Sequence, residues 1–346
     1  KGVGILKLPK KTMWIAGSIL LVLILLVGSG GLIAKHYLNK INRVDESTLS
    51  TVAPKDEDFE VDPPTAPEAS SQIVLDPEAV EWEEIEQIED DALVNLMLVG
   101  QDRREGEGRQ RSDTMILCSI NPDTKQVSLI SFMRDLYVRI PGGYSDNRLN
   151  AAYAFGGFPL LDDTIYENFG ITIDGNIEVD FERFEKVIDV LGGVDIVLTA
   201  AEAEHLGRGT FAGMNHLDGK MALEYARIRK IDSDFQRTER QRNILEAAFR
   251  KIKHLSLSEM KDLANAILPS LTTDLTDAQI FSLLFQMFPV FRSMELSSYR
   301  IPADQTYYSA MIRGMYVLVP DLPKIRSLLQ EEYLPLHASG RKEALH

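Results

Sequence analysis

Arginine and aspartate residues gather in three short segments of this 346-residue chain, where together they could bind a phosphorylated substrate. Four arginines lie between Asp102 and Asp113, the pair Arg134–Asp135 follows an apolar run, and further arginines lie within residues 227–242. A guanidinium group matches phosphate oxygens with paired hydrogen bonds. Carboxylates suit Mg²⁺, which proteins commonly hold with one or two carboxylates plus phosphate oxygens. The residue types therefore point to phosphate chemistry assisted by a divalent metal.

The third segment predicts a helix that begins near Asp234. Ser233 and Gln236 have the spacing of a capping box, in which each side chain accepts a hydrogen bond from the backbone of the other residue. Upstream of this helix, Arg227 and Arg229 share a face only if the backbone between them is extended.

Arg237, Arg240 and Gln241 fall in the first turns of the same predicted helix, on one face. The N-terminus of a helix carries partial positive charge, so arginines there are unfavourable unless an anion or carboxylates neutralise them. A local conflict of this kind is expected at a functional site rather than at an ordinary surface.

Each segment also has a less specific interpretation. The stretch from Asp102 to Asp113 can be a solvated charged loop with local ion pairs. Arg134 and Asp135 can form a surface ion pair, which usually contributes little to stability. The residue types alone leave these alternatives open.

Hydrophobic patterns predict the elements that position these segments. Apolar runs bounded by Gly or turn residues are typical of buried strands, which we expect at 93–100, 114–120, 126–132, 177–180, 194–198 and 296–301. The second and third should form an antiparallel hairpin. Helices are expected at 149–155, 160–168, 181–191, 219–225 and 234–254, with Gly156–Gly157 separating the first two and Gly192–Gly193 capping the third. This mixture predicts an α/β fold with a mixed central sheet covered by helices on both faces.

An uncharged apolar segment, Met13–Ala34, precedes these elements. Its 22 residues would form a helix of roughly 33 Å, long enough to cross the hydrocarbon core of a bilayer. Residues 1–12 contain lysines and no acid, which favours a cytoplasmic N-terminus. We therefore expect one transmembrane helix and a single-pass protein of the cell membrane whose main domain is extracellular. The alternative is a signal peptide cleaved near Gly28–Gly31.

Negative charge is concentrated in residues 44–91, which hold 17 acidic residues and one lysine. Because the whole chain carries −15, the remainder sums to +1, which gives no support for a nucleic-acid partner. Residues 35–90 are rich in Asp, Glu, Pro, Ser and Thr and are predicted to form a disordered acidic stalk. Its last part, Glu81–Ile88, is predicted to form a short helix that leads into the domain. A catalytic domain at 91–335 and a C-terminal tail at 336–346 complete the predicted organisation.

Several motifs in this order resemble the LytR-CpsA-Psr family of bacterial envelope proteins. The resemblance is carried by Arg111–Met115, Met133–Val138, Asn150–Gly157, Leu191–Asp195, His216–Arg229, and Asp234–Arg237 with Arg240–Gln241. It implies a phosphotransferase of a Gram-positive-type bacterium. Such an enzyme moves an anionic glycopolymer, such as teichoic acid or capsule, from an undecaprenyl-pyrophosphate carrier to peptidoglycan and forms a phosphodiester. One departure is Met133, where the family usually has Pro before Arg-Asp.

The resemblance also implies roles for individual residues. Asp102 and Asp113 would hold Mg²⁺ (or Mn²⁺). Catalysis would depend on Asp102, Arg134, Arg229 and Arg237. The pyrophosphate would be bound by Arg103, Arg111, Arg134, Arg227, Arg229, Arg237, Gln241 and Asp234, and Asp180 is a further candidate for the polar wall of the site.

Two other functions are compatible with the same residues. A hydrolase of polyprenyl pyrophosphate would use water as the acceptor in place of a cell-wall sugar. A non-catalytic lipid-phosphate-binding regulator of the envelope would bind tightly without turnover. Either the Asp102 or the Asp234 carboxylate could act as general base in a transfer reaction, or the metal and the arginines could suffice, and the sequence does not decide among these alternatives.

Overall fold

The computed structural model describes residues 35–44, 51–54, 59, 73–101, 111–228, 231 and 233–337. The predicted transmembrane segment Met13–Ala34 and the predicted site residues Asp102, Arg103 and Arg229 lie outside these ranges. Within the described ranges, no helix is both long enough and apolar enough to cross a membrane.

A seven-stranded mixed sheet forms the centre of the part of the chain that the structure describes, in the order β1-β11-β8-β3-β4-β5-β12. Strand β4 pairs antiparallel with both β3 and β5, whereas β8 runs parallel to β3 and β12 runs parallel to β5. The predicted mixed sheet and hairpin are therefore confirmed. The strands are β1 (Asn42–Arg43), β3 (Val94–Gln101), β4 (Thr114–Asn121), β5 (Gln126–Phe132), β8 (Gly175–Asp180), β11 (Leu271–Thr273) and β12 (Glu295–Ile301).

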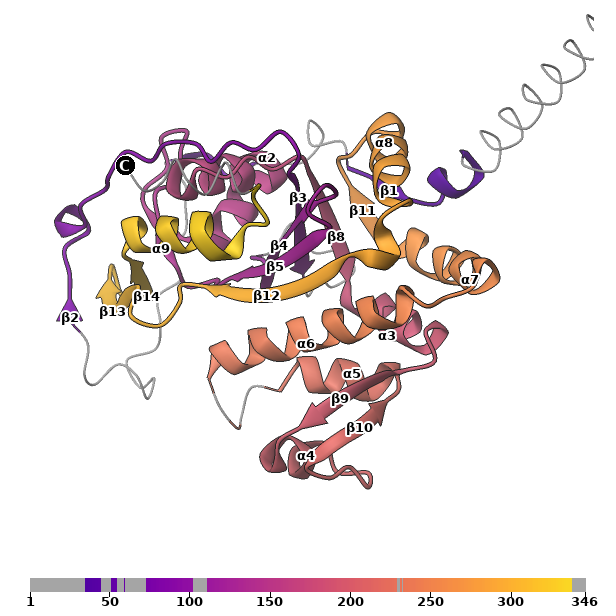
Figure 1. Cartoon of the computed structure of the whole chain (residues 1–346). Helices are drawn as coiled ribbons and strands as arrows, with labels where there is room; N and C mark the ends of the chain where they lie inside the picture. The colour runs from indigo at the N-terminus through magenta and orange to yellow at the C-terminus, as the bar shows by residue number, and fades with distance from the viewer. Residues whose placement is uncertain are drawn as a thin grey trace, which may run out of the picture.

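Helices cover both faces of this sheet, as predicted (Figure 1). Helices α2 (Leu149–Phe169) and α9 (Leu322–Leu328) lie on one side, and α3 (Phe181–Val190) and α6 (Asp234–Ile252) lie on the other. The two helices expected around Gly156–Gly157 are joined into α2, with a kink at Gly157 (φ 68°, ψ −151°). That backbone conformation is one that glycine adopts readily and other residues avoid.

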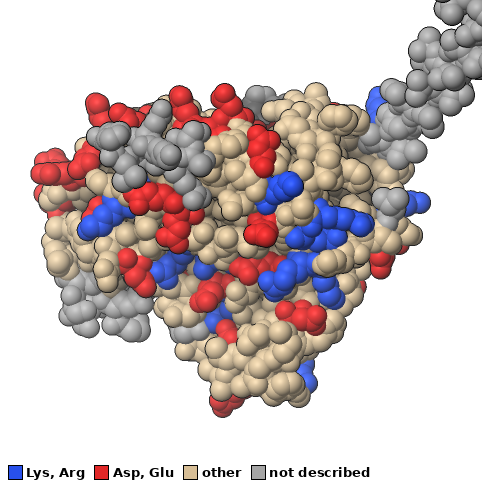
Figure 2. All heavy atoms as spheres, viewed as in Figure 1, with Lys and Arg blue, Asp and Glu red and all other residues tan. Residues whose placement is uncertain are grey.

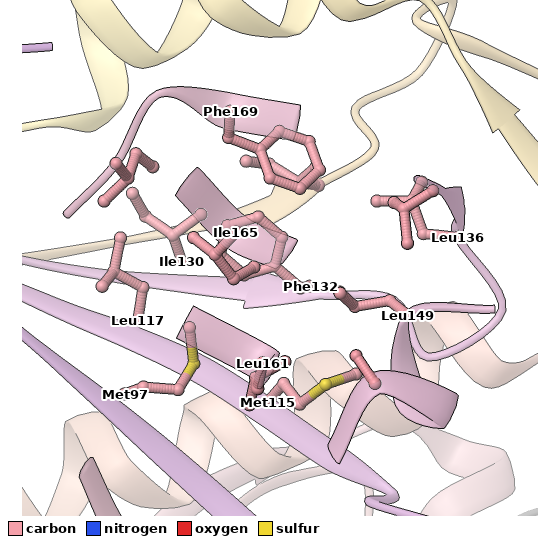
Figure 3. Close-up of a cluster of buried hydrophobic side chains, with 14 of the residues drawn as sticks. Met97, Met115, Leu117, Ile130, Phe132, Leu136, Leu149, Leu161, Ile165 and Phe169 are labelled. Atoms are coloured by element: carbon pink, nitrogen blue, oxygen red, sulfur yellow. The ribbon is translucent and has the colours of Figure 1, made fainter. Parts of the chain in front are cut away.

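The main core lies between the sheet and α2 (Figure 3). Met97, Leu117, Ile130 and Phe132 of the sheet pack with side chains of α2 such as Phe169, and each of these side chains is almost fully buried. Burying a side chain of this size contributes roughly 1.5–3 kcal/mol. This core fixes β4, β5 and the N-terminal end of α2 relative to one another.

A second core lies under α6, away from the main sheet. Here α3 and α6 pack with β9 (Val194–Leu198), β10 (Gly213–Leu217), α4 (Ala200–Leu206) and α5 (Gly219–Ala226), and Figure 1 shows this group projecting below the sheet. The cap after α3 is confirmed, because the N–H of Gly193 bonds to the carbonyl of Ile188 at 2.9 Å and both Gly192 and Gly193 have positive φ. Elements α4 and β10 were not predicted.

Smaller elements complete the described fold. A three-stranded sheet has the order β14 (Met315–Pro320), β13 (Tyr307–Ile312) and β2 (Ile73–Val74). A short ladder joins β6 (Tyr137–Val138) to β7 (Asn147–Arg148). Helices α7 (Leu257–Ile267) and α8 (Asp277–Met287) lie near the β11 end of the main sheet in Figure 1.

The last part of the predicted stalk packs on the domain, which corrects the expectation of a spacer up to residue 90. Trp82 Nε1 donates to Asp146 Oδ2 at 2.8 Å, and its ring stacks on Tyr137 at 6.0 Å. Ile88 belongs to the main core, and β2 pairs with β13. The helix expected at Glu81–Ile88 is also wrong, because this stretch has no helix. The few apolar side chains in the last part of the predicted stalk each pack on the domain separately. The acidic average composition of the stalk gave no indication of these contacts.

Candidate active site

Arg134 lies in the turn that follows β5, at one end of the main sheet. The turn is held from two sides: Met133 N–H bonds to the Ile301 carbonyl at 2.8 Å, and Asn150 N–H bonds to the Arg134 carbonyl at 3.3 Å. Met133 itself is 1% exposed, and its sulfur lies 3.6 Å from the Thr238 hydroxyl of α6. Methionine at this position therefore fills the space beneath α6, and its departure from the family pattern leaves the turn well supported.

Three carboxylates surround the Arg134 guanidinium among the described residues. Nη1 donates to Asp113 Oδ1 at 2.8 Å, while Nε lies 3.3 Å from Asp234 Oδ2 and 3.6 Å from Asp135 Oδ2. Burial alone would lower the pKa of Arg134, but Asp135, Asp234 and Asp113 raise it overall. Arg134 is therefore a permanently charged group, and its alternative interpretation as a simple surface pair with Asp135 is wrong.

Asp234 links Arg134 to Arg237. Arg237 is 2% exposed, and its Nη2 donates to Asp234 Oδ2 at 2.8 Å. Both residues lie in the first turn of α6, whose N-terminus has the predicted capping box between Ser233 and Gln236. The predicted conflict between Arg237 and the helix dipole is thus partly relieved by Asp234, since an acid in the first turn is favourable.

Arg111 reaches the same corner of the molecule from the start of β4. Its Nη1 lies 3.4 Å from Asn150 Oδ1, and its guanidinium lies over the Phe155 ring at 5.7 Å. Asn150 is also the residue whose backbone bonds to Arg134. The N-terminal turns of α2 therefore hold Arg111 and Arg134 near one another.

One further charged residue that contacts these side chains was not predicted. The buried Arg148, at the N-cap of α2, has Nε 3.5 Å from Asp135 Oδ1 and donates to the Tyr316 carbonyl at 2.9 Å. Asp135 is consequently shared by Arg134 and Arg148. An arginine just before a helix carries no distinctive sequence signal, so Arg148 could be found only from the fold.

The structure brings together part of the predicted set. Asp113, Arg134, Asp234 and Arg237 form one continuous series of ion pairs, with Arg111 adjacent. Gln241 lies one turn further along α6, and its buried Oε1 accepts no hydrogen bond from the described residues. We call Asp113, Arg134, Asp135, Arg148, Asp234 and Arg237 the charged network.

Other members of the predicted set have different surroundings or lie outside the described residues. Arg227 is exposed and lies at the C-cap of α5. Arg240 turns toward the second core, where Nη1 lies 3.2 Å from Glu202 Oε1 and Nη2 donates to the Ile228 carbonyl at 2.9 Å. The prediction that Arg240 shares one functional face with Arg237 is therefore wrong, since Arg240 neutralises a buried glutamate. Asp180, the further candidate for the polar wall of the site, is the last residue of β8.

The donor chemistry at Asp113 suits Mg²⁺, although no group of three or more His, Cys, Asp or Glu side chains converges as a metal cage among the described residues. Mg²⁺ keeps waters and substrate phosphate oxygens and needs only one or two carboxylates from the protein. Asp113 supplies one carboxylate that is 27% exposed and lies within the charged network. The residues present therefore fit a metal held jointly by protein and substrate.

A separate hollow of about 430 Å³ lies near the C-terminal end of α6. Arg250, Lys251 and His254 are among its lining residues. Lys251 Nζ donates to the carbonyls of Gly193 at 2.7 Å and Gly192 at 3.0 Å, so this ammonium group caps the end of α3. The hollow shares no lining residue with the charged network, which remains the stronger candidate for phosphate chemistry.

The site and fold together define an α/β protein with a network of paired arginine and aspartate side chains at one end of a mixed sheet. The family model described as the LytR_cpsA_psr family matches residues 51–332, and the chain belongs to the LytR-CpsA-Psr family.

Relatives and solved structures agree with this assignment. The chain is 35% identical over 288 residues to the polyisoprenyl-teichoic acid–peptidoglycan teichoic acid transferase TagU of Oceanobacillus iheyensis, covering 80% of this chain and 81% of the relative. The structure of TagT bound to LIIa-WTA has 28% identity and a TM-score of 0.56, covering 73% of this chain and 96% of the other. The crystal structure of B. subtilis TagT has 26% identity and a TM-score of 0.56, covering 75% and 99%.

Proposed function

We propose that this protein transfers an anionic glycopolymer from an undecaprenyl-pyrophosphate carrier to peptidoglycan and forms a phosphodiester. The observation that carries the proposal is the series of ion pairs that links Asp113, Arg134, Asp234 and Arg237 at one end of the sheet. The name of the O. iheyensis relative, which describes a teichoic acid transferase, supports the same reaction class.

The reaction replaces a phosphoanhydride bond of the carrier pyrophosphate with a phosphoester bond to the acceptor sugar. A hydroxyl oxygen of the peptidoglycan sugar attacks the polymer-side phosphorus of the pyrophosphate. The bond from that phosphorus to the bridging oxygen breaks, so polyprenyl monophosphate leaves with the bonding electron pair and the hydroxyl proton passes to a base. Phosphoryl transfer of this kind depends mainly on positioning and charge neutralisation.

Arg134 and Arg237 are well placed for that role. Their guanidinium groups share the Asp234 carboxylate, so both are fixed before a substrate binds. Fixed positive groups stabilise developing charge without the cost of reorganising during the reaction. We assign to Arg134 and Arg237 the stabilisation of charge on the bridging and non-bridging oxygens, with Arg103, Arg111, Arg227, Arg229 and Gln241 as further substrate ligands.

Asp234 is a weak candidate for the general base. Its Oδ2 lies 3.3 Å from Arg134 Nε and 2.8 Å from Arg237 Nη2, so these two guanidinium contacts occupy this oxygen and hold the carboxylate in place. Asp102 is the remaining candidate named from the sequence, and we assign Asp234 a positioning role instead.

We further propose that the enzyme uses Mg²⁺, or Mn²⁺, held by Asp113 together with Asp102. When bound, the metal supplies charge neutralisation at phosphate oxygens. We also propose that Met13–Ala34 anchors the protein in the cell membrane with residues 1–12 inside and the catalytic domain outside. The uncharged 22-residue segment supports this topology.

A product analysis tests the proposed function. The full-length chain would be mixed with a lipid-linked teichoic acid precursor and Mg²⁺, with and without peptidoglycan strands. A transferase yields polymer bound to glycan through phosphate and releases polyprenyl phosphate only when the acceptor is present. Equal release of polyprenyl phosphate without acceptor would indicate a hydrolase, and binding without either product would indicate a non-catalytic regulator.

A further inference from the structure

Helix α8 presents a stripe of large apolar side chains to solvent. Phe281 is 50% exposed, Leu284 60%, Phe285 78% and Phe288 67%, and none of the residues of α8 is buried. Their spacing of three, four and seven residues places the four side chains on one side of the helix. A contiguous exposed patch of this kind usually marks a surface that contacts a partner or a membrane. We call these four residues the α8 stripe.

Helix α8 lies beside the segment that follows the uncharged N-terminal run. Strand β1 pairs with β11, which leads into α8, and Figure 1 draws residues 35–44 next to α8. Arg43 Nη2 lies 2.5 Å from Asp277 Oδ1 in the first turn of α8, and Arg43 Nη1 donates to the Leu275 carbonyl at 2.5 Å. Arg43 is nine positions after Ala34, and this length of chain can span at most about 30 Å. The proposed membrane anchor therefore ends close to α8.

We propose that the α8 stripe inserts into the outer surface of the same bilayer that holds the anchor. This inference rests on the proposed membrane topology and adds a second attachment point to it. An amphipathic helix that lies in the interface buries its apolar face by about 5–10 Å. The four large side chains of the α8 stripe are the type of surface that such burial requires, and Figure 2 shows a largely uncharged area over α8.

The chemistry of α8 favours lipid chains over anionic headgroups as the partner. The helix Asp277–Met287 contains no Lys or Arg, so it lacks the basic face with which many interfacial helices bind anionic lipid. Insertion should therefore depend on apolar burial and should persist in zwitterionic vesicles at high salt. Two attachment points would also restrict rotation of the domain about its anchor, which keeps its site in a constant orientation toward a carrier lipid in that bilayer.

Site-directed fluorescence tests the insertion. The full-length chain with Cys118→Ala would carry Phe285→Cys labelled with an environment-sensitive dye and would be reconstituted in phosphatidylcholine vesicles that contain doxyl-labelled lipid. We expect the emission of the dye to shift to shorter wavelength and to fall by roughly half as interfacial burial brings it to the acyl chains. Two controls are Gln286→Cys, about 100° round the same helix, and Met214→Cys, an exposed apolar residue on distant β10. Both should be quenched far less.

Each alternative gives a different result. Equal, weak quenching at positions 285 and 214 in protein that floats with the vesicles would overturn the insertion while leaving the anchor intact. Burial of the dye that appears only at high protein-to-lipid ratio, without doxyl quenching, would indicate that the α8 stripe packs against a second copy of the chain. That result would also overturn the insertion. Protein that does not float with vesicles would refute the topology and the insertion together. Strong quenching at 285 in protein that transfers no polymer would support the insertion and refute only the proposed function.

Discussion

Replacing Arg134 with Gln would test whether the charged network performs chemistry or only stabilises the fold. The substitution removes the guanidinium from Asp113 at 2.8 Å, Asp234 at 3.3 Å and Asp135 at 3.6 Å while keeping a polar side chain. If Arg134 stabilises charge that develops in the transition state, its loss should lower the rate of transfer by about 10²–10³-fold. That range corresponds to about 3–4 kcal/mol of activation free energy.

The accompanying loss of stability should be moderate. The side chains of Arg134 and its three partners are between 25% and 29% exposed, so solvent screens them partly. Asp234 retains Arg237 and Asp135 retains Arg148 after the substitution. We therefore expect the free energy of unfolding to fall by about 1–3 kcal/mol, less than the 3–5 kcal/mol typical when one partner of a buried pair is removed.

A matched control separates the two effects. Arg139→Gln removes an arginine five residues further on, whose Nη2 lies 3.7 Å from Glu167 and which lies outside the charged network. Transfer from lipid-linked precursor to peptidoglycan and urea denaturation would be measured for both variants. The assignment of Arg134 would be refuted if both variants transferred polymer at similar rates, or if the loss at Arg134 disappeared once unfolded protein was subtracted.

Three further predictions concern single groups elsewhere. Arg240→Met leaves the Glu202 carboxylate buried without its partner and should lower the free energy of unfolding by about 3–5 kcal/mol in urea denaturation; a change below about 1 kcal/mol would contradict the buried pair. Burial alone would raise the pKa of Asp90, but hydrogen bonds, the strongest from the backbone N–H of His337, lower it overall from 3.8. Because the pKa of Asp90 is lower in the folded than in the unfolded protein, its hydrogen bonds stabilise the fold above about pH 4, and this stabilisation is lost as pH falls through the folded pKa. Acid should therefore lower the free energy of unfolding of the wild type more steeply than that of Asp90→Asn. Burial raises the pKa of the Cys118 thiol to about 12, so iodoacetamide at about pH 8 should modify native protein far more slowly than urea-unfolded protein, as read by mass spectrometry.

The sequence was informative where a local pattern dictates the structure. The apolar runs predicted β3, β4 and β5, and the hairpin register that pairs Met115 with Phe132 brings Asp113 and Arg134 to the same end of the sheet. The Ser233–Gln236 spacing predicted the start of α6 because a capping box depends only on neighbouring residues. Part of the candidate site could therefore be placed before the fold was known.

Other features depended on contacts between distant segments. Strands β1 and β2 have two residues each and exist because they pair with β11 and β13, so no local pattern specifies them. Helix α4 was missed although Thr199 and Glu202 form a capping box, a local signal that could have found it. The Arg240–Glu202 pair could not be inferred, because it joins side chains 38 positions apart across the second core.

The charge balance of the charged network limits what it can bind by itself. Its three arginines, Arg134, Arg148 and Arg237, are matched by three carboxylates, so the six described side chains sum to zero. The carboxylates hold the guanidiniums in place, but they also occupy part of their hydrogen-bonding capacity. A pyrophosphate therefore needs positive charge from outside this set, either from neighbouring arginines such as Arg111 or from a divalent cation that neutralises Asp113. The charged network is accordingly better described as a rigid frame that needs further cations to bind a pyrophosphate than as a complete anion-binding site.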